Sequence, residues 1–354
     1  MTTADQASDR GMRVARLYAW NDVRIEEQRI PDIGPGEALV RIEACGVCGS
    51  DALRWYVEEK APVVLGHEPA GTIVELGAGV ESLRIGDRVF VHHHAPCGEC
   101  AECARGLWSS CATWRATRLD PGGFSEYARV MATNVERDTL VLPPDIDFDS
   151  ATFIEPVACC LRAVRRKGAL REGDAIAIVG LGAMGLVMVQ LARTFGASAI
   201  AASDFVADRR ERARLAGAAA AVDPRETSLR DAVRDLTGGR GADVVIVCPP
   251  VDAAFHDGIA AAAPGARVVC FTPRAPDQPL MIRQSFLYFR EITLAQSYSC
   301  GPDETREALE LLVARRIDVA SLVTHREPLA GVGEALERAA GKRDGIRSIV
   351  YPQQ

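Results

Sequence analysis

A repeating alternation that begins at residue 174 constrains the fold of this 354-residue chain more than any other feature. Short, continuously apolar runs such as AIAIVG, ADVVIVC and ARVVCF alternate there with amphipathic helical stretches such as AMGLVMVQLARTF and SLRDAVRDL. Strands without polar alternation are buried on both faces, which happens when helices cover both sides of a parallel sheet. Residues 158–299 are therefore predicted to form an α/β domain with a doubly wound parallel sheet of the Rossmann type.

The segments on either side of this domain have a different pattern. From residue 13 to about 145, apolar and polar positions alternate in short runs broken by proline and glycine, which is typical of antiparallel strands and turns. After residue 300 the sequence predicts a helix, an extended LVTHREPL, a second helix and a last strand, RSIVYP. We therefore expect a β-rich domain built from residues 13–157 and 300–354, with residues 1–12 as a disordered tail.

A glycine-rich turn, GLGAMG, follows the first apolar run of the α/β domain and opens a helix. Gly180 allows a tight turn, Gly182 lets a pyrophosphate approach the backbone, and Gly185 lets helix and strand pack closely. In this position the G-x-G-x-x-G motif predicts a dinucleotide site, which we expect to include Ala183 and Met184.

The residue that selects the dinucleotide is expected at the end of the second strand. Asp204 stands there, 19 residues after Gly185. Its carboxylate can accept hydrogen bonds from ribose hydroxyls and repel a 2′-phosphate, so we expect NAD rather than NADP. Arg209 and Arg210 follow in DRRERAR; they could hold a phosphate or belong to a solvated helix face, and Arg209 is kept as a candidate cofactor contact.

Four cysteines form a compact group with the spacing C-x2-C-x2-C-x7-C: Cys97, Cys100, Cys103 and Cys111. The chain has eleven cysteines, and its first residues, MTTADQASDRG, lack the apolar stretch of a signal peptide. We therefore expect a cytoplasmic protein whose cysteines are metal ligands or thiols rather than disulfides. Four thiolates on short turns suit a closed, tetrahedral structural zinc, which has no open position for chemistry.

A second set of metal-ligating residue types lies elsewhere in the β-rich segments. Cys48 lies in CGVCGSD, His67 and Glu68 lie in GHE, and Glu155 lies where these segments meet the first helix. Each residue alone would be assigned to the core or the surface. Together, one thiolate, one imidazole and one or two carboxylates form the mixed set expected for a catalytic zinc with a free position for water or substrate.

The ordered set of motifs, from CGVCGSD and GHE through the four-cysteine loop and PGGFSEY to Glu155-Pro156 and GLGAMG, resembles the medium-chain zinc-dependent alcohol dehydrogenases. The likeness covers residues 13 to about 352 and is greatest to the sorbitol and threonine dehydrogenase branch. It implies a GroES-like catalytic domain beside the Rossmann domain. It also implies hydride transfer between NAD and a secondary alcohol or ketone, with a polyol, sugar, cyclitol or amino alcohol as the substrate.

The resemblance also implies roles for single residues in the catalytic domain. Cys48 and His67 would ligate the catalytic zinc, and Glu68 and Glu155 would supply the remaining ligands, directly or with one acting through water. The carboxylate at 155 replaces the cysteine of simple alcohol dehydrogenases, which favours the polyol branch.

A proton relay is implied by the same likeness. Asp51 resembles the carboxylate that orients the ligating imidazole, and Ser50 resembles the hydroxyl that carries the substrate proton outward. Leu53 stands where ethanol-type enzymes have the histidine that ends this relay, so the proton could leave through water and a glutamate. His92, His93 and His94 are expected to alternate along a strand, mostly in structural roles, with His93 or a neighbour lining the substrate site.

Composition and charge exclude several other classes of function. With 41 basic and 48 acidic residues the net charge is −7, which disfavours nucleic acid and anionic membranes as partners, and no run of 18 apolar residues predicts a membrane span. A small-molecule substrate and a homodimer or homotetramer are expected. Two alternatives stay open: a zinc-free quinone or enone reductase would not need the two cysteine-containing sets, and a non-catalytic zinc-binding protein would not need the glycine-rich turn with Asp204.

Overall fold

A computed structural model of the protein describes residues 11–341 and 344–354. The described chain divides into two compact units. The β-rich unit contains the residues up to Glu155 together with Gly301–Val313 and Val319–Gln354, and the α/β unit contains Pro156–Cys300 and Ala314–Asp318. The chain thus leaves the β-rich unit after Glu155, builds most of the α/β unit, returns at Gly301, and visits the α/β unit once more at Ala314–Asp318.

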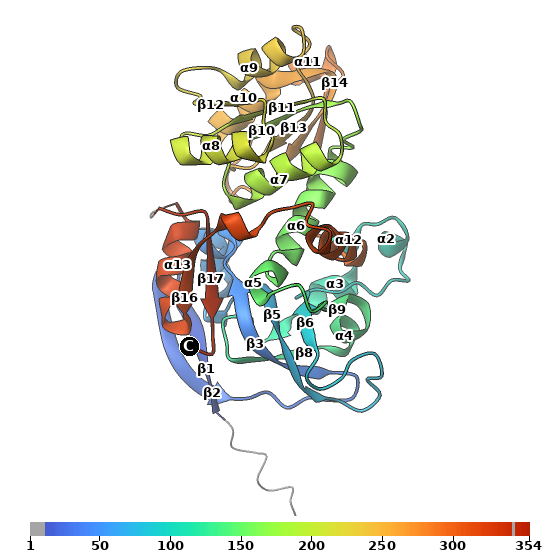
Figure 1. The fold of residues 1–354 in the computed structure, drawn as a ribbon, viewed down its shortest axis with the longest axis vertical. Coiled ribbons are helices and arrows are strands. Elements are labelled where there is room, and N and C mark those ends of the chain that lie inside the picture. Colours follow the sequence, from blue (N-terminus) through green and yellow to red (C-terminus); the bar gives the residue numbers. More distant parts are fainter. Residues whose placement is uncertain (1–10, 342–343) are drawn as a thin grey trace, which may run out of the picture. The chain divides into compact units, whose positions relative to one another are not determined.

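The α/β unit is built on a six-stranded parallel sheet (Figure 1). In spatial order its strands are β12 (Ala220–Val222), β11 (Ala199–Ser203), β10 (Ala175–Val179), β13 (Ala242–Val247), β14 (Ala262–Cys270) and β15 (Thr293–Gln296). In chain order this is 3-2-1-4-5-6, the doubly wound arrangement. Every residue of β10 and β11 is buried, which explains why these strands show no polar alternation. The expected doubly wound parallel sheet is confirmed.

Helices connect these strands in the order that the sequence predicts. Those of the α/β unit are α7 (Ala183–Thr194), α8 (Ala207–Ala216), α9 (Leu229–Leu236), α10 (Asp252–Ala261) and α11 (Gln284–Tyr288). α6 (Ile154–Leu161) begins in the β-rich unit and continues into a π-helical turn at Arg162–Lys167. In α9 the buried residues Leu229, Ala232 and Val233 have the spacing of one helix face, and Ser228 caps the helix by accepting a hydrogen bond from the backbone N–H of Asp231.

The β-rich unit contains two sheets. The larger one has the spatial order β16 (Val323–Pro328), β17 (Arg347–Tyr351), β3 (Ala38–Gly46), β5 (Glu68–Leu76), β6 (Arg88–Val91) and β9 (Thr139–Val141), with β8 (Tyr127–Val130) beside β3 and β7 (Leu119–Asp120) beside β8. The smaller one has the order β2 (Asp22–Arg29), β1 (Gly11–Ala19) and β4 (Val63–Val64). The C-terminal strand β17 pairs antiparallel with β3, which joins the last segment of the chain to the first.

Short helices fill the connections of this unit. They are α1 (Arg54–Lys60), α2 (Ala101–Ala104), α3 (Ala112–Ala116), α4 (Ala132–Asp138), α5 (Phe148–Ala151), α12 (Pro302–Val313) and α13 (Val332–Ala339), with 3₁₀ turns at Gly49–Ala52, Trp108–Ser110, Ala320–Leu322 and Leu329–Gly331. Within the part of the chain that the structure describes, no helix combines the length and the apolar character needed to cross a membrane.

The start of the structured chain differs from the expectation by two residues. β1 begins at Gly11, and Met12 is buried in the core, so residues 11 and 12 belong to a strand and not to the expected tail. Their backbone pairs with the end of β2, and the apolar Met12 side chain gains from burial, which holds them in the sheet. The rest of the expected tail, residues 1–10, lies outside the described residues.

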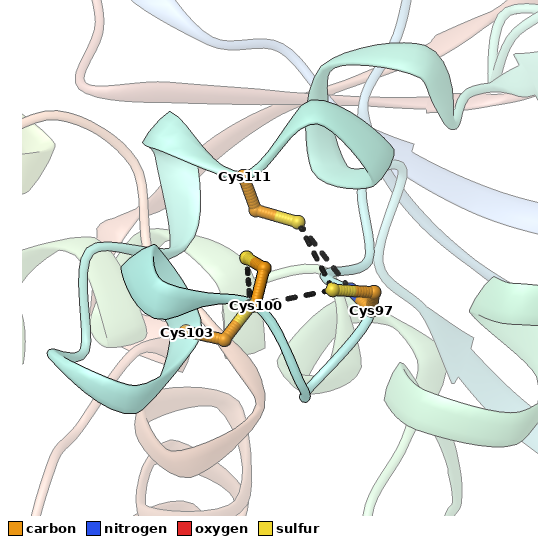
Figure 2. Close-up of side chains that lie close together, drawn as sticks. All are labelled: Cys97, Cys100, Cys103 and Cys111. Atoms are coloured by element: carbon orange, nitrogen blue, oxygen red, sulfur yellow. Dashed lines mark hydrogen bonds between the residues drawn. The ribbon is translucent and has the colours of Figure 1, made fainter.

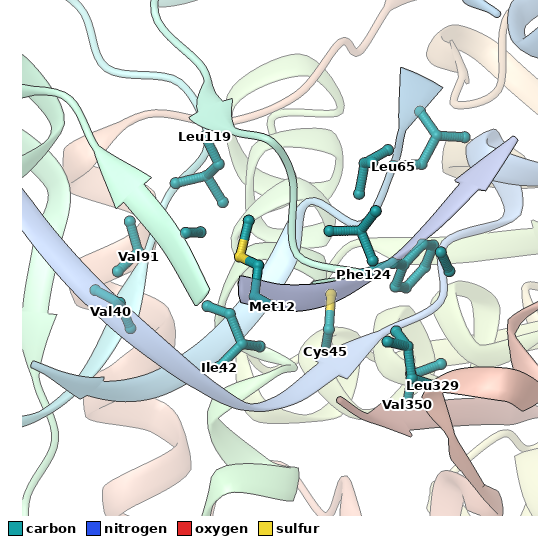
Figure 3. Close-up of a cluster of buried hydrophobic side chains, with 14 of the residues drawn as sticks. Met12, Val40, Ile42, Cys45, Leu65, Val91, Leu119, Phe124, Leu329 and Val350 are labelled. Atoms are coloured by element: carbon teal, nitrogen blue, oxygen red, sulfur yellow. The ribbon is translucent and has the colours of Figure 1, made fainter. Parts of the chain in front are cut away.

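The core of the β-rich unit draws apolar side chains from distant parts of the sequence (Figure 3). The residues buried in it include Met12 of β1, Ile42 and Cys45 of β3, Val350 of β17, and Phe124, which lies shortly before β8. Cys45 is thus a buried core thiol. This core fixes the start of β5 and the end of β3, which carry the residues described next.

Candidate active site and metal centres

The side chains of the four cysteines come together in one cluster (Figure 2). The Sγ atoms of Cys97 and Cys103 are 3.9 Å apart, those of Cys100 and Cys103 are 3.4 Å apart, and those of Cys111 and Cys97 are 3.6 Å apart. A zinc tetrahedron with Zn–S bonds of about 2.3 Å has edges of about 3.8 Å, so the four sulfurs already have the spacing of a zinc site. None of the eleven cysteines, all of which lie within the described residues, forms a disulfide.

The loop that carries these cysteines has little apolar material of its own. Its core consists of Cys103, Cys111 and Trp114, with Trp108 packed against them. The indole of Trp114 also contacts the imidazole of His94, whose Nδ1 is 2.5 Å from the carbonyl oxygen of Thr117. So small a cluster cannot by itself hold a loop of this length in shape, which is the role that a structural metal performs.

The mixed set of metal-ligating side chains comes together at the end of β3 and the start of β5. Cys48 caps the 3₁₀ turn Gly49–Ala52, and its Sγ accepts the backbone N–H of Ser50 at 3.5 Å. His67 directly precedes β5, and Glu68 is the first residue of that strand. One ligand atom each from Cys48, His67 and Glu68 lie within 4.8 Å of one another. The structure therefore groups three of the four expected catalytic ligands.

Asp51 contacts the imidazole ring of His67. Nδ1 of His67 is 3.1 Å from Oδ1 of Asp51, and the Asp51 side chain is buried. Because Nδ1 donates to this carboxylate, Nε2 is the nitrogen that can bind a metal. Burial lowers the pKa of His67, but the negative charges of Asp51 and Cys48 outweigh it and raise the pKa well above its usual value. The resemblance assigns this orienting role to Asp51, and the geometry is compatible with it.

Glu68 has a second neighbour that the sequence does not reveal. Its Oε2 forms a buried ion pair with Arg347 of β17, which also donates to the carbonyl oxygen of Val47 at 3.0 Å. Burial raises the pKa of Glu68 to about 7, and the charges of Glu155 and Asp51 add to this rise, while the charge of Arg347 acts against it. Glu68 is thus grouped with Cys48 and His67 and is also paired with a buried cation.

Glu155 lies at the start of α6 and is buried. One of its oxygens lies within 4.8 Å of a ring nitrogen of His92, and its charge affects both Glu68 and Arg347. Cys48, Asp51 and Glu68 therefore place negative charge around the imidazole of His67, whereas Glu155 is grouped with His92 and acts on Glu68 and on the buried Arg347. Such a set of sulfur, nitrogen and oxygen donors suits a divalent zinc, and these are the residues that would hold it.

The three consecutive histidines do not alternate along a strand. β6 ends at Val91, and the rings of His92 and His93 are 5.1 Å apart, while those of His93 and His94 are 4.2 Å apart. The expected alternation is wrong because the strand ends one residue before the histidines, where the chain turns into the cysteine loop. Nδ1 of His92 is 2.6 Å from Oδ2 of Asp138, so His92 and His94 both have structural contacts.

The glycine-rich turn has the geometry that a dinucleotide needs. Gly180 has a φ of +89°, which a residue with a side chain rarely adopts. A Cβ at Gly185 would lie 2.0 Å from the carbonyl oxygen of Gly180, whereas a Cβ at Gly182 would meet open space. Gly182 is the N-cap of α7, and Ala183 and Met184 form its first turn. The backbone N–H groups at this helix start are suited to bind a pyrophosphate.

Asp204 follows β11 at the same end of the sheet. Its Oδ2 accepts the N–H of Leu181 at 2.7 Å, and its Oδ1 accepts the N–H of Val206 at 2.8 Å. Nη1 of Arg209 lies 3.9 Å from Oδ2 of Asp204. Arg210 donates to the carbonyl oxygen of Asp204 at 2.8 Å and lies 3.1 Å from the carboxylate of Asp223. The alternative of a solvated helix face is therefore wrong for Arg210, because a buried carboxylate holds it.

Two buried contacts near the site escape sequence reasoning. Arg347 is separated from Glu68 by 279 positions, and no local pattern links them. The only signal is an arginine at the start of the last strand, RSIVY, because a charged residue that is buried there requires a partner. The contact between His92 and Asp138 has no local signal, because the two residues lie on different elements.

Comparisons with known proteins agree with this geometry. Residues 34–139 match the model of the alcohol dehydrogenase GroES-like domain, and residues 183–314 match that of zinc-binding dehydrogenases. Sorbitol dehydrogenase of Bacillus subtilis (strain 168) is 30% identical over 360 residues, covering 97% of this chain and 98% of the relative. L-threonine 3-dehydrogenase of Pyrococcus horikoshii is 34% identical over 268 residues, covering 74% and 75%. A zinc-binding dehydrogenase from Sinorhizobium meliloti 1021, solved bound to NADP, is 30% identical with a TM-score of 0.87, covering 97% and 100%.

Proposed function

Since this chain belongs to the zinc-binding alcohol dehydrogenase family, an enzyme family that uses zinc and a nicotinamide dinucleotide, we propose that it oxidises a secondary hydroxyl of a small polyol, sugar, cyclitol or amino alcohol with NAD, or reduces the matching ketone. The observation that supports this most is the grouping of Cys48, His67 and Glu68 within 4.8 Å, separate from the closed four-cysteine group. A closed set serves structure, and a mixed set with carboxylates serves catalysis.

The residues of the mixed set have distinct roles in this proposal. Cys48 and His67 hold the metal, Asp51 fixes the ring of His67, and Glu68 and Glu155 provide oxygen donors. When bound, zinc lowers the pKa of the substrate hydroxyl towards neutrality and the dinucleotide takes up the hydride. Ser50, whose backbone N–H is bonded to Cys48, relays the proton, since its hydroxyl accepts the substrate proton while giving up its own. Leu53 cannot pass that proton further, so it leaves through water or a glutamate.

The substrate class is inferred from the relatives and from Glu155. Sorbitol and threonine, which name the two relatives, each carry a hydroxyl or amino group on the carbon next to a secondary hydroxyl. An oxygen donor at position 155 leaves the metal a stronger Lewis acid than a second thiolate would. We therefore place the reacting hydroxyl of the substrate beside a second oxygen or nitrogen.

The choice of NAD over NADP is part of the proposal. It is supported by Asp204, whose carboxylate stands where a 2′-phosphate would have to be accommodated. The relative from Sinorhizobium meliloti was solved with NADP, and Arg209 beside Asp204 is the residue of this chain that would favour the phosphate. We give more weight to the negative charge of Asp204, which favours NAD, because one of its carboxylate oxygens accepts a hydrogen bond from Leu181 of the glycine-rich turn.

We infer the oligomeric state from an exposed edge of the α/β unit, and the cellular compartment from the thiol ligands. β15 is an edge strand of the parallel sheet. Tyr288 and Phe289 are highly exposed around a hollow of about 770 Å³, which is lined by Pro264, Gln284 and residues 287–292. A second copy of this chain would cover this edge and its aromatic side chains. We further infer that the enzyme works in the cytoplasm, where thiol ligands stay reduced.

The test is a screen of NADH formation by the zinc-loaded protein over polyols, sugars, cyclitols and amino alcohols, with NADP in parallel. We expect turnover that depends on zinc and is abolished in Cys48→Ser, while a Cys270→Ser variant, which changes a thiol outside both metal sets, keeps it. Turnover that survives removal of the metal by a chelator would contradict the proposal and favour the zinc-free reductase class.

A further inference from the structure

The three histidines after β6 leave one polar atom without a partner. His92 is bonded to Asp138, and His94 is bonded to the carbonyl oxygen of Thr117 and packs on Trp114. Nδ1 of His93 is buried, and no group among the described residues forms a hydrogen bond with it. Two of the three rings are thus accounted for by the fold, and the middle one is not.

A buried imidazole nitrogen without a partner destabilises the fold, since water no longer satisfies it. A phenylalanine or leucine would fill similar space without that cost. The strand has already ended at Val91, so the sheet does not require a polar residue here. Unpaired buried polar groups of this kind point to a ligand that completes the hydrogen bond.

The position of His93 indicates which ligand this is. Its ring centre lies 4.9 Å from that of His67, which belongs to the proposed catalytic ligand set. A group that hydrogen-bonds to His93 therefore lies close to whatever the metal holds. A substrate that binds the metal and also bonds to His93 needs its second polar group near the reacting hydroxyl, and hydroxyls on neighbouring carbons meet this requirement.

We propose that His93 is a specificity-determining residue, which forms a hydrogen bond to a second hydroxyl on the carbon next to the one that is oxidised. This inference rests on the proposed function and narrows its substrate class to vicinal diols. A neutral imidazole offers one N–H and one acceptor nitrogen, and a hydroxyl can serve either. Simple secondary alcohols leave the nitrogen unsatisfied and are disfavoured for that reason.

The experiment compares two ligands of equal carbon number, butane-2,3-diol and butan-2-ol, in the zinc-loaded full chain. Their dissociation constants are measured by NADH fluorescence in the complex with NADH, in which no alcohol can be oxidised, and kcat and KM are measured separately with NAD. The variants are His93→Phe, His93→Leu and His93→Gln. His94→Gln is the matched control, because it removes a histidine whose nitrogen bonds to the backbone.

We expect His93→Phe and His93→Leu to reduce the preference for the diol about tenfold, mostly in Kd and KM rather than in kcat. His93→Gln keeps most of the preference, since an amide also donates and accepts, and His94→Gln leaves the preference unchanged. Equal changes for both ligands in His93→Phe and His93→Leu, or a loss as large in His93→Gln, would overturn the inference. Absence of NADH formation together with a His93-dependent preference in binding would overturn only the proposed function.

Discussion

Single carboxylates determine much of the chemistry proposed for this enzyme. Glu155 is buried, lies near His92, and adds negative charge at Glu68. Burying a carboxylate costs free energy that a cation or hydrogen bonds must compensate, so Glu155 requires charged or polar neighbours. A bound metal ion and the buried guanidinium of Arg347 would both compensate the negative charge of Glu155.

Glu155→Ala is expected to lower kcat for vicinal diols by about 100-fold, since it removes the oxygen donor that we propose for the metal. The unfolding midpoint should change by less than about 4 °C, because the fold does not depend on this donor. Glu136→Ala is the control, as that carboxylate is exposed on α4 of the same unit. Unchanged turnover in Glu155→Ala, or equal wild-type rates for diols and simple secondary alcohols, would make Glu155 a structural residue.

Asp204 serves the backbone as well as the proposed ribose contact. Asp204→Ala is expected to raise the ratio of NADP to NAD activity about 10- to 100-fold, because a negative charge next to the 2′-phosphate is removed. It should also lower activity with NAD, since the N–H groups of Leu181 and Val206 lose their acceptor. Asp204→Asn keeps one acceptor oxygen and is expected to shift the ratio with a smaller loss. A wild-type preference for NADP would assign the selection to Arg209 instead.

The elements themselves were largely predictable, since their patterns are local. Continuously apolar runs marked β10, β13 and β14, and the glycine-rich turn marked the start of α7. The failures have local causes too: β6 ended earlier than the pattern of alternation suggested, and β1 began earlier because Met12 has a place in the core. The grouping of Cys48, His67 and Glu68 followed from residue types and the resemblance, whereas the pairing of Glu68 with Arg347 depends on a strand pair that no short pattern encodes.

The cysteine loop is the element whose stability depends most on its metal. Cys103→Ser is expected to lower the unfolding midpoint of the β-rich unit by about 8–16 °C, the equivalent of about 4 kcal/mol, because the loop has only a small apolar cluster without zinc. Calorimetry measures this change. Cys270→Ser, in the other unit, serves as the control and should change the midpoint little. If Cys103→Ser retained its zinc and its midpoint, the four cysteines would not form a metal site.

For the whole molecule, two zinc ions per chain are expected. Metal analysis of the purified wild type should return two, and both Cys48→Ser and Cys103→Ser should return one. The two variants differ in what they lose: the first keeps the fold and loses turnover, and the second loses stability. One zinc or none in the wild type would contradict the assignment of two separate sites.

Self-association is expected at the exposed edge of the α/β unit. Phe289→Glu should convert a dimer or tetramer to smaller species in analytical ultracentrifugation, because it places a charge on the aromatic surface beside β15. Leu215→Glu on α8 is the control, as that apolar side chain is equally exposed but lies on another element. A wild type that sediments as a monomer would show that this surface is not an interface.

The ion pair between Glu68 and Arg347 imposes an order on biosynthesis. A ribosome adds about 5–20 residues per second, so Arg347 is made on the order of 15–55 s after Glu68, from which 279 positions separate it. Cys97 and Cys111 are only 14 positions apart, and their loop is complete within about 1–3 s. The nascent chain can therefore take up its structural metal early, while the catalytic ligands must wait for the end of translation before their buried counter-charge exists.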